Sequence, residues 1–143
     1  MVIRAARADD VPSLVGLFED WGHAQPAAVI AERLRAWEAT PHAAILVAEV
    51  EGSVAGVAAV AATPHLARPG RVARLTGLVV GRGFRRRGVA GALVRAAEEH
   101  ARGWACDRIE ATSRRTRPEA PGFYAALGYA DQSERQARYS RPL

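Results

Sequence analysis

The stretch from Arg71 to Arg102 constrains the fold of this chain more than any other segment. Arg71–Val80 has the length and the apolar character of a β-strand, and Val89–Arg102 repeats apolar residues at helical spacing. A loop rich in glycine and arginine joins them, and Arg108–Thr112 reads as a further strand. Two strands joined through a helix run parallel and take a right-handed crossover, so the chain must contain a parallel pair.

The rest of the chain supplies antiparallel strands and more helices. Glu51-Gly52 separates two apolar runs and predicts the turn of an antiparallel hairpin. Asp9 is expected to cap the first helix. The other predicted elements are a strand at Val2–Ala6, a helix ending near Trp21, a helix from Pro26 that ends at Thr40-Pro41, hairpin strands at Ala44–Val50 and Val54–Ala61, a helix at Glu119–Leu127 and one or two edge strands within Tyr129–Ser140. A mixed α/β sheet with helices on both faces follows.

Length and composition bound the class of protein. The chain has 143 residues, of which 49% are hydrophobic, which supports one folded domain over residues 1–143. No apolar run reaches the ~20 residues of a membrane span, and no secretory signal opens the chain, so a cytoplasmic protein is expected. The single cysteine, Cys106, excludes an internal disulfide and a cysteine metal cluster, and the four histidines have no metal-ligand spacing.

The chain is basic, with 20 Lys+Arg against 15 Asp+Glu. Every one of these basic residues is arginine, a pattern typical of GC-rich coding, so the excess charge is a weak argument for a polyanionic partner. The longest basic run has three residues, and only Phe84 stands beside it as a stacking aromatic. Nucleic-acid binding is therefore the least favoured function, and no nucleic-acid or membrane partner is expected.

The loop from Gly81 to Gly88 carries the clearest chemical signal. It leaves a strand and enters a helix, whose unpaired N–H groups and positive dipole end suit a phosphate. Gly88 allows the backbone to approach an anion, and Arg85, Arg86 and Arg87 add charge. The glycine spacing fits neither a dinucleotide-binding fingerprint nor a Walker loop. The alternative is a basic surface turn whose glycines only permit the bend.

Two motifs together resemble a known family. Arg85-x-x-Gly88-x-Ala90, between an apolar strand and an amphipathic helix, resembles the acyl-CoA loop of the GNAT N-acetyltransferases. About thirty residues later, Ala120 followed by Phe123-Tyr124-x-x-Leu127-Gly128-Tyr129 resembles the second signature of that family. The order of elements also matches along almost the whole chain. The resemblance implies the acyl-CoA N-acyltransferase fold, a mixed, centrally splayed sheet flanked by helices on both faces.

The resemblance also implies a cofactor site for acetyl-CoA, the co-substrate. Pantetheine would enter a splay between the strands at Arg74–Val80 and Arg108–Thr112, and a bulge at Gly77 would start that splay. The strand residues expected to bind pantetheine are Leu78, Val79 and Val80. The loop residues expected to hold the diphosphate are Arg85, Arg86, Arg87, Gly88, Val89 and Ala90. Arg117 stands where the family often has an Asn that contacts the cofactor, so this contact is lost or replaced.

The catalytic residues implied are an acid and a base. Tyr124 resembles the family tyrosine that meets the cofactor sulfur and protonates the departing thiolate, although its helical stripe also fits a packed core aromatic. Glu110 shares a strand face with Arg108 and Thr112 near the splay and is the first candidate for the base. Glu49, His42, His65 and a chain of water molecules are the alternatives.

The function that follows is transfer of an acetyl group from acetyl-CoA to a primary amine by direct attack. The acceptor would be a small molecule or a peptide amine. A catalytically silent acyl-CoA-binding or regulatory domain is the alternative. A homodimer is expected for two reasons. The tail Ser133–Arg141 is expected to form an edge strand that can pair with a second copy, and members of the family it resembles are often homodimers.

Overall fold

A computed structural model of the chain describes residues 1–113 and 116–143. The chain divides into two compact units, Met1–Thr112 and Ser113–Leu143, and each is described by itself. The first unit holds the sheet and three of the predicted helices, and the second holds one short helix and the C-terminal tail.

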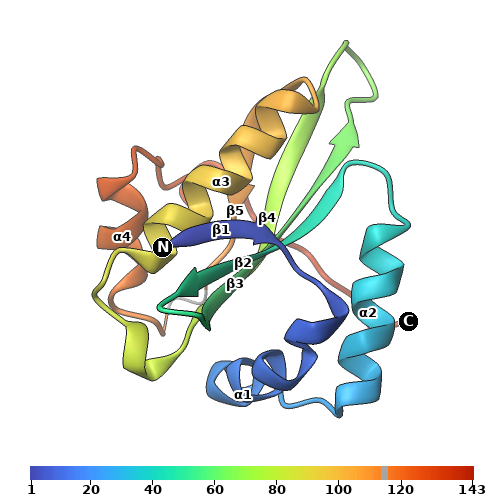
Figure 1. Cartoon of the computed structure of the whole chain (residues 1–143). Coiled ribbons are helices and arrows are strands. Elements are labelled where there is room, and N and C mark those ends of the chain that lie inside the picture. The colour runs from blue at the N-terminus through green and yellow to red at the C-terminus, as the bar shows by residue number, and fades with distance from the viewer. Residues whose placement is uncertain (114–115) are drawn as a thin grey trace. The chain divides into compact units, whose positions relative to one another are not determined.

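The first unit is built on one sheet with the strand order β1-β2-β3-β4-β5 (Figure 1). The hairpin and the long strand after it make the first four strands antiparallel, while β4 and β5 are parallel. The predicted crossover between them is confirmed, and its helix is α3 (Val89–Gly103). The strand bounds are β1 Val2–Ala5, β2 Ala43–Val50, β3 Ser53–Pro64, β4 Arg71–Val80 and β5 Cys106–Ala111.

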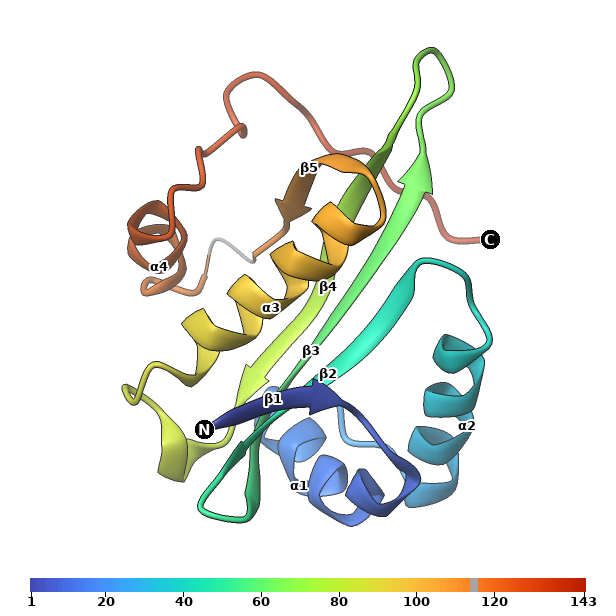
Figure 2. The same cartoon turned by 45° about the horizontal axis from the view of Figure 1, so that its top comes forward.

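Helices cover both faces of this sheet, as predicted (Figure 2). Helices α1 (Val11–Trp21) and α2 (Ala27–Glu38) pack on one face, where their apolar residues meet Val47, Val57 and Val79 in one buried cluster. Helix α3 packs on the other face. A side chain at Gly56 of β3 would stand 3.2 Å from both Leu93 and Val89, so a glycine lets α3 lie close to the sheet.

The start of α1 differs from the prediction. A 3-10 turn, η1 (Ala8–Asp10), precedes the helix, and Asp10 rather than Asp9 holds the junction. The Asp10 carboxylate accepts the backbone N–H of Arg7 at 2.7 Å and receives two hydrogen bonds of 2.8 Å from the Arg4 guanidinium. Asp9 is exposed. The long-range partner on β1 decides between two adjacent aspartates, which local spacing does not distinguish.

The second unit contains α4 (Ala120–Ala126), within the predicted range Glu119–Leu127. The prediction of edge strands within Tyr129–Ser140 is wrong, because the described tail contains no strand. The tail instead turns on itself: Arg135 and Gln136 donate their backbone N–H groups to the Gln132 carbonyl, and the Asp131 carboxylate accepts the N–H of Ser133. Polar residues without an alternating apolar face satisfy their backbone locally. No helix in the described residues is long and apolar enough to cross a membrane.

Candidate functional site

Strands β4 and β5 pair only over the first half of β4. Arg71 lies opposite Cys106, Leu75 lies opposite Ala111, and this last pair ends the parallel ladder. β4 continues to Val80, so its last residues have no β5 residue beside them. A bulge marks the parting point, because Leu75 and Gly77 oppose consecutive residues of β3 and leave Thr76 as the extra residue. The splay and the bulge expected near Gly77 are both present.

The register decides which backbone groups of β4 face the opening. The N–H of Gly81 donates to the Ala55 carbonyl at 2.9 Å, so Gly81 points its backbone toward β3. Because backbone direction alternates along a strand, Val79 also points toward β3, while Leu78 and Val80 point away from it. The Arg85 side chain reaches the Val80 carbonyl on that side, at 3.4 Å. Leu78 and Val80 therefore offer backbone groups at the opening, while Val79 is bonded within the sheet and buried.

The loop between β4 and α3 presents a row of unused backbone amides. It begins with a 3-10 turn, η2 (Arg82–Phe84), and continues through two residues with positive φ, Arg86 at 62° and Gly88 at 77°. A Cβ on Gly88 would meet nothing within 4 Å, so the outer surface of this turn is open. Among the described residues, no hydrogen bond uses the backbone N–H groups of residues 85–91. The loop and the first turn of α3 thus form a continuous set of donors suited to an anion.

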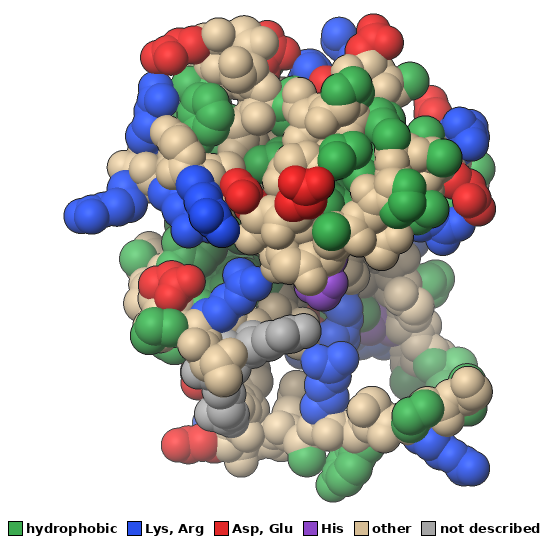
Figure 3. Space-filling model, turned by 90° about the horizontal axis from the view of Figure 1, so that it is seen from below, with side chains coloured by type: hydrophobic (Ala, Val, Ile, Leu, Met, Phe, Trp, Pro, Cys, Tyr) green, Lys and Arg blue, Asp and Glu red, His purple; other side chains and the backbone are tan. Residues whose placement is uncertain are grey.

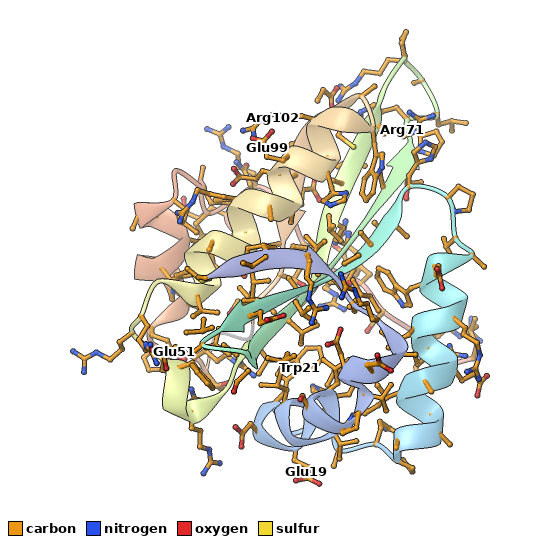
Figure 4. The ribbon with its side chains drawn as sticks, viewed as in Figure 1. Glu19, Trp21, Glu51, Arg71, Glu99 and Arg102 are labelled. Carbon is orange, nitrogen blue, oxygen red and sulfur yellow. The ribbon has the colours of Figure 1, made fainter. Side chains whose placement is uncertain are left out.

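The arginines of this loop have different partners. Arg87 lies 3.0 Å from the Glu51 carboxylate at the β2–β3 turn and stacks over the Phe84 ring, and Arg82 lies 3.4 Å from Asp20. Arg86 has no ion pair within the part of the chain that the structure describes. Figure 3 shows basic side chains on several sides of the molecule, among them the side where Figure 1 places the start of α3, and Figure 4 shows Glu51 beside this loop. Arg85 and Arg86 are the side chains most available to a bound anion.

The first candidate for the base is held by two arginines. Glu110 Oε2 accepts a hydrogen bond from Arg74 at 3.1 Å, and its Oε1 lies 3.0 Å from Arg108 Nε. Both carboxylate oxygens are therefore engaged. Each oxygen still has a second lone pair, so a substrate ammonium would share the carboxylate with the two guanidiniums.

The alternative bases are held elsewhere in the first unit. Glu49 of β2 pairs with Arg4 at 3.1 Å, and the His42 ring packs edge-on against Trp104. His65 lies 2.9 Å from the Asp107 carboxylate, beside the Arg71 end of β4. That end lies roughly 30 Å along the strand from Val80, at about 3.3 Å per residue. Figure 4 shows Arg71 and Glu51 at opposite ends of the sheet, which places His65 far from the amide-rich loop.

Tyr124 lies in α4 of the second unit. Its ring makes edge contacts with Phe123 and Tyr129, at 5.0 and 5.5 Å between centroids, and its carbonyl accepts the N–H of Tyr129 at 3.0 Å. Burial raises the pKa of the Tyr124 phenol above its ordinary value, and the positive charge of Arg117 opposes this rise. The hydroxyl is therefore protonated at neutral pH and can donate a proton.

One aromatic residue at the site, Trp21, was named in the sequence analysis only as the end of a helix. A Cβ placed on Gly77 would stand 3.0 Å from Cη2 of Trp21, so the end of α1 rests on β4 beside the bulge. Figure 4 shows Trp21 on the α1 side of the sheet. A glycine within an apolar strand was the available signal, because such a glycine often marks close approach by another group.

Known proteins share this fold over nearly the whole chain. A proposed acetyltransferase from Agrobacterium tumefaciens is 25% identical, with a TM-score of 0.86, and the match covers 99% of this chain and 100% of the other. A ribosomal-protein-alanine N-acetyltransferase from Brucella melitensis gives 17% identity and a TM-score of 0.81 over 100% of both chains. An aminoglycoside N-acetyltransferase in complex with CoA gives 20% identity and a TM-score of 0.79 over 99% and 100% of the two chains.

A search of curated proteins found no significant match. The sequence profile described as the acetyltransferase (GNAT) family matches residues 12–129, which include the amide-rich loop, both splayed strands and Tyr124. With a splayed mixed sheet between helices and neighbours that share its fold, the chain belongs to the acetyltransferase (GNAT) family.

Proposed function

We propose that this protein is an acetyl-CoA-dependent N-acetyltransferase that moves the acetyl group to a primary amine by direct attack. The observation that carries the proposal is the continuity of two unused donor sets, the free edge of β4 and the amides of residues 85–91. Membership of the family supports acetyl transfer as the general activity. One ligand with an extended amide-containing arm and a diphosphate would use both sets.

The residues present suit acetyl-CoA. In this proposal the backbone groups of Leu78 and the carbonyl of Val80 pair with the amides of pantetheine, and the diphosphate takes the N–H groups of the loop. The positive end of α3 favours the negative charge, and so does the Arg86 guanidinium, which has no ion pair among the described residues. The loop residues that carry this role are Arg85, Arg86, Arg87, Gly88, Val89 and Ala90. Because the backbone of Val79 is bonded to β3, the neighbouring residues Leu78 and Val80 bind pantetheine in this proposal.

The proposed chemistry needs no covalent enzyme intermediate. The neutral amine attacks the thioester carbonyl, a C–N bond forms, and the oxygen takes the negative charge of a tetrahedral intermediate. The outward N–H of Val80 is placed to stabilise that oxyanion. The intermediate then expels the CoA thiolate, which takes a proton from Tyr124, and the tyrosinate regains a proton from water. In this scheme the amine nitrogen gives its proton to water. Glu110, whose two oxygens each already accept a hydrogen bond from an arginine, is the second choice of base.

A catalytically silent acyl-CoA-binding domain is the second candidate. One observation favours it. Within the described residues of the first unit, the carboxylate beside the splay, Glu110, is already paired with two arginines. Such a domain would keep the loop and the strand edge and would bind acetyl-CoA without turnover.

Two measurements on the full chain separate these candidates. Calorimetry measures acetyl-CoA binding, and a thiol-reactive dye measures CoA release with a panel of primary amines. Binding with amine-dependent release supports the enzyme, and binding without release by any amine supports the silent domain. Gly88→Glu should abolish acetyl-CoA binding, since it adds a negative side chain where the diphosphate would lie. Gly22→Glu is the matched control, because Gly22 also has a positive φ and open surroundings. Equal affinity of wild type and Gly88→Glu would contradict the loop assignment.

We also propose that the protein is a homodimer and works in the cytoplasm on a small-molecule or peptide amine, without a nucleic-acid partner. The tail offers no edge strand, so the dimer proposal depends on the habits of the family alone. Light scattering at high concentration tests it, and a monomeric mass would refute it.

A further inference from the structure

Within the first unit, Arg74 is exposed on one face of the sheet, close to the point where the pairing of β4 with β5 ends. Side chains of paired residues share a face, and Val57 and Val79 fix the face covered by α1 and α2. By register, Ala61, Arg74 and Glu110 form one row on that same face, and Gly77 with Trp21 above it lies in the next row toward Val80. The opposite face is covered by α3, where Ala73 and Leu75 are buried. A molecule approaching the strand opening therefore comes from the face of Arg74.

Together with Arg108, which lies on the same face of β5 as Glu110, this row carries a net positive charge. Arg74 and Arg108 both contact Glu110, and the exposed fractions of their side chains are 53% and 56%, against 30% for Glu110. A guanidinium has five N–H donors, and the contact to Glu110 uses one nitrogen of each arginine. The carboxylate of Glu110 thus holds both guanidiniums, and most of their N–H donors are not used in these two contacts.

We propose that Arg74 and Arg108 bind a carboxylate of the amine acceptor, so that the substrates are amino-carboxylates. This inference rests on the proposed function and names its substrate class. A substrate carboxylate takes the free N–H donors of the two arginines, while its amine extends along the face toward Gly77 and the acetyl group. Glu110 is then a positioning residue that acts through the arginines.

The charges on this face select against other amines. A polyamine or an aminoglycoside would bring further cations beside two guanidiniums whose nearest carboxylate is already paired. Two like charges within a few ångströms disfavour binding, and the penalty grows with each added cation. A neutral amine would leave the arginine donors to water and gain nothing from them. A carboxylate is the group that gains charged hydrogen bonds here.

The test uses three series of primary amines that differ only in the group at the far end. The first series is glycine, β-alanine, 4-aminobutyrate, 5-aminopentanoate and 6-aminohexanoate. The amino alcohols of the same lengths replace the carboxylate with a hydroxyl, and the diamines replace it with an ammonium. CoA release gives kcat/KM for each. At the best length we expect the amino acid to exceed the amino alcohol by about tenfold and the diamine to be slowest. A faster diamine would overturn the inference.

Arg74→Gln supplies the residue-level test. We expect this variant to reduce the ratio of kcat/KM between the amino acid and the amino alcohol about fivefold, mainly through a higher KM for the amino acid. An effect of about fivefold lies between the contributions of exposed ion pairs and of charged hydrogen bonds. The control is Arg33→Gln, which removes the same charge from an exposed ion pair on α2. An equal effect of the two variants would show that net charge alone is responsible and would overturn the inference.

Acetyl-CoA calorimetry on the same proteins separates the two proposals. If acetyl-CoA binds and the three series react equally, the acetyltransferase proposal stands and the carboxylate site falls. If wild type does not bind acetyl-CoA, the proposed function is wrong. The carboxylate site is then tested without turnover, by comparing the affinity for 5-acetamidopentanoate with the affinity for the corresponding amide. Tighter binding of the acid, lost in Arg74→Gln, supports the site. Equal binding of acid and amide refutes it.

Discussion

The indole of Trp21 lies against Gly77, where β4 bulges and β5 ends its pairing. An added Cβ at Gly77 would stand 3.0 Å from the ring, closer than ordinary packing allows. The end of α1 is therefore fixed to the point at which the sheet opens. Since Trp21 also contacts the rings of Phe18 and His23, this contact ties an aromatic group to the edge of the candidate site.

Gly77→Ala is expected to lower the free energy of unfolding by about 1–3 kcal/mol, because the new methyl group overpacks against a rigid ring. Urea denaturation measures the change. Trp21→Leu should cost stability by itself through lost packing. The double variant should be less destabilised than the sum of the two, because the smaller side chain leaves room for the methyl group. Simple additivity would show that the two residues do not contact each other.

Gly88→Ala tests the backbone of the amide-rich loop. Its φ of 77° makes any side chain strained, at a cost of about 1 kcal/mol. Gly22→Ala carries the same strain at φ 87°, also with open space around the added methyl group. Both variants should lose similar stability in thermal melts. Only Gly88→Ala should weaken acetyl-CoA binding in calorimetry, and a similar loss in Gly22→Ala would assign the effect to general destabilisation.

Tyr124→Phe removes the proposed proton donor and keeps the ring. We expect kcat to fall by about 10²–10⁴-fold, with acetyl-CoA affinity and Tm nearly unchanged. Tyr139→Phe, at an exposed position, is the control. Because burial raises the pKa of Tyr124, its hydroxyl stays protonated through neutral pH and loses its proton only above its ordinary pKa. The hydroxyl-dependent part of kcat should therefore be flat near pH 7 and fall only in strongly basic solution.

Two other outcomes would deny Tyr124 that role. Unchanged turnover and unchanged Tm would make it a packing residue. A fall in Tm along with turnover would identify its hydroxyl as a structural hydrogen bond.

Asp10→Asn should destabilise the fold by about 2–4 kcal/mol at pH 7, because it leaves the Arg4 guanidinium without its main partner. The hydrogen bonds from Arg4 hold the pKa of Asp10 below its ordinary value. The stability that this lowered pKa contributes is present above the unfolded-state pKa of about 3.9 and is lost as pH falls through the folded-state value. Urea denaturation between pH 7 and pH 3 should show a shallower acid loss in the variant. The neighbouring Asp9→Asn is the control, and an equal effect there would contradict the assignment.

Glu110→Gln distinguishes a positioning residue from a base. A positioning role predicts a higher KM for amino-carboxylates and an unchanged pH dependence of kcat, because the loosened arginines bind the acceptor less well. A role as base predicts a large fall in kcat and the loss of one limb of its pH profile. Steady-state kinetics across pH with the best amino acid decides between them.

Local sequence patterns were sufficient to predict most of the elements and the candidate loop. The predicted bounds of β4 agree with the observed bounds at both ends. The positive φ angles of Glu51 and Gly52 confirm the predicted turn. These features follow from local chemistry, since periodicity, turn residues and glycine conformation act over a few residues. The amide-rich loop belongs to the same group, because Gly88 and the start of α3 are neighbours in the chain.

Tertiary structure alone decided which groups at the site are free. That Val79 bonds to β3 while Val80 faces the opening depends on register, and the pairing of Glu110 with Arg74 joins residues from two strands. The choice of Asp10 over Asp9 depends on Arg4, and the absence of a tail strand depends on hydrogen bonds around Gln132. Each of these outcomes is a competition for hydrogen-bond partners. The sequence names the competitors, and only the packed structure brings together the distant groups that settle which of them pair.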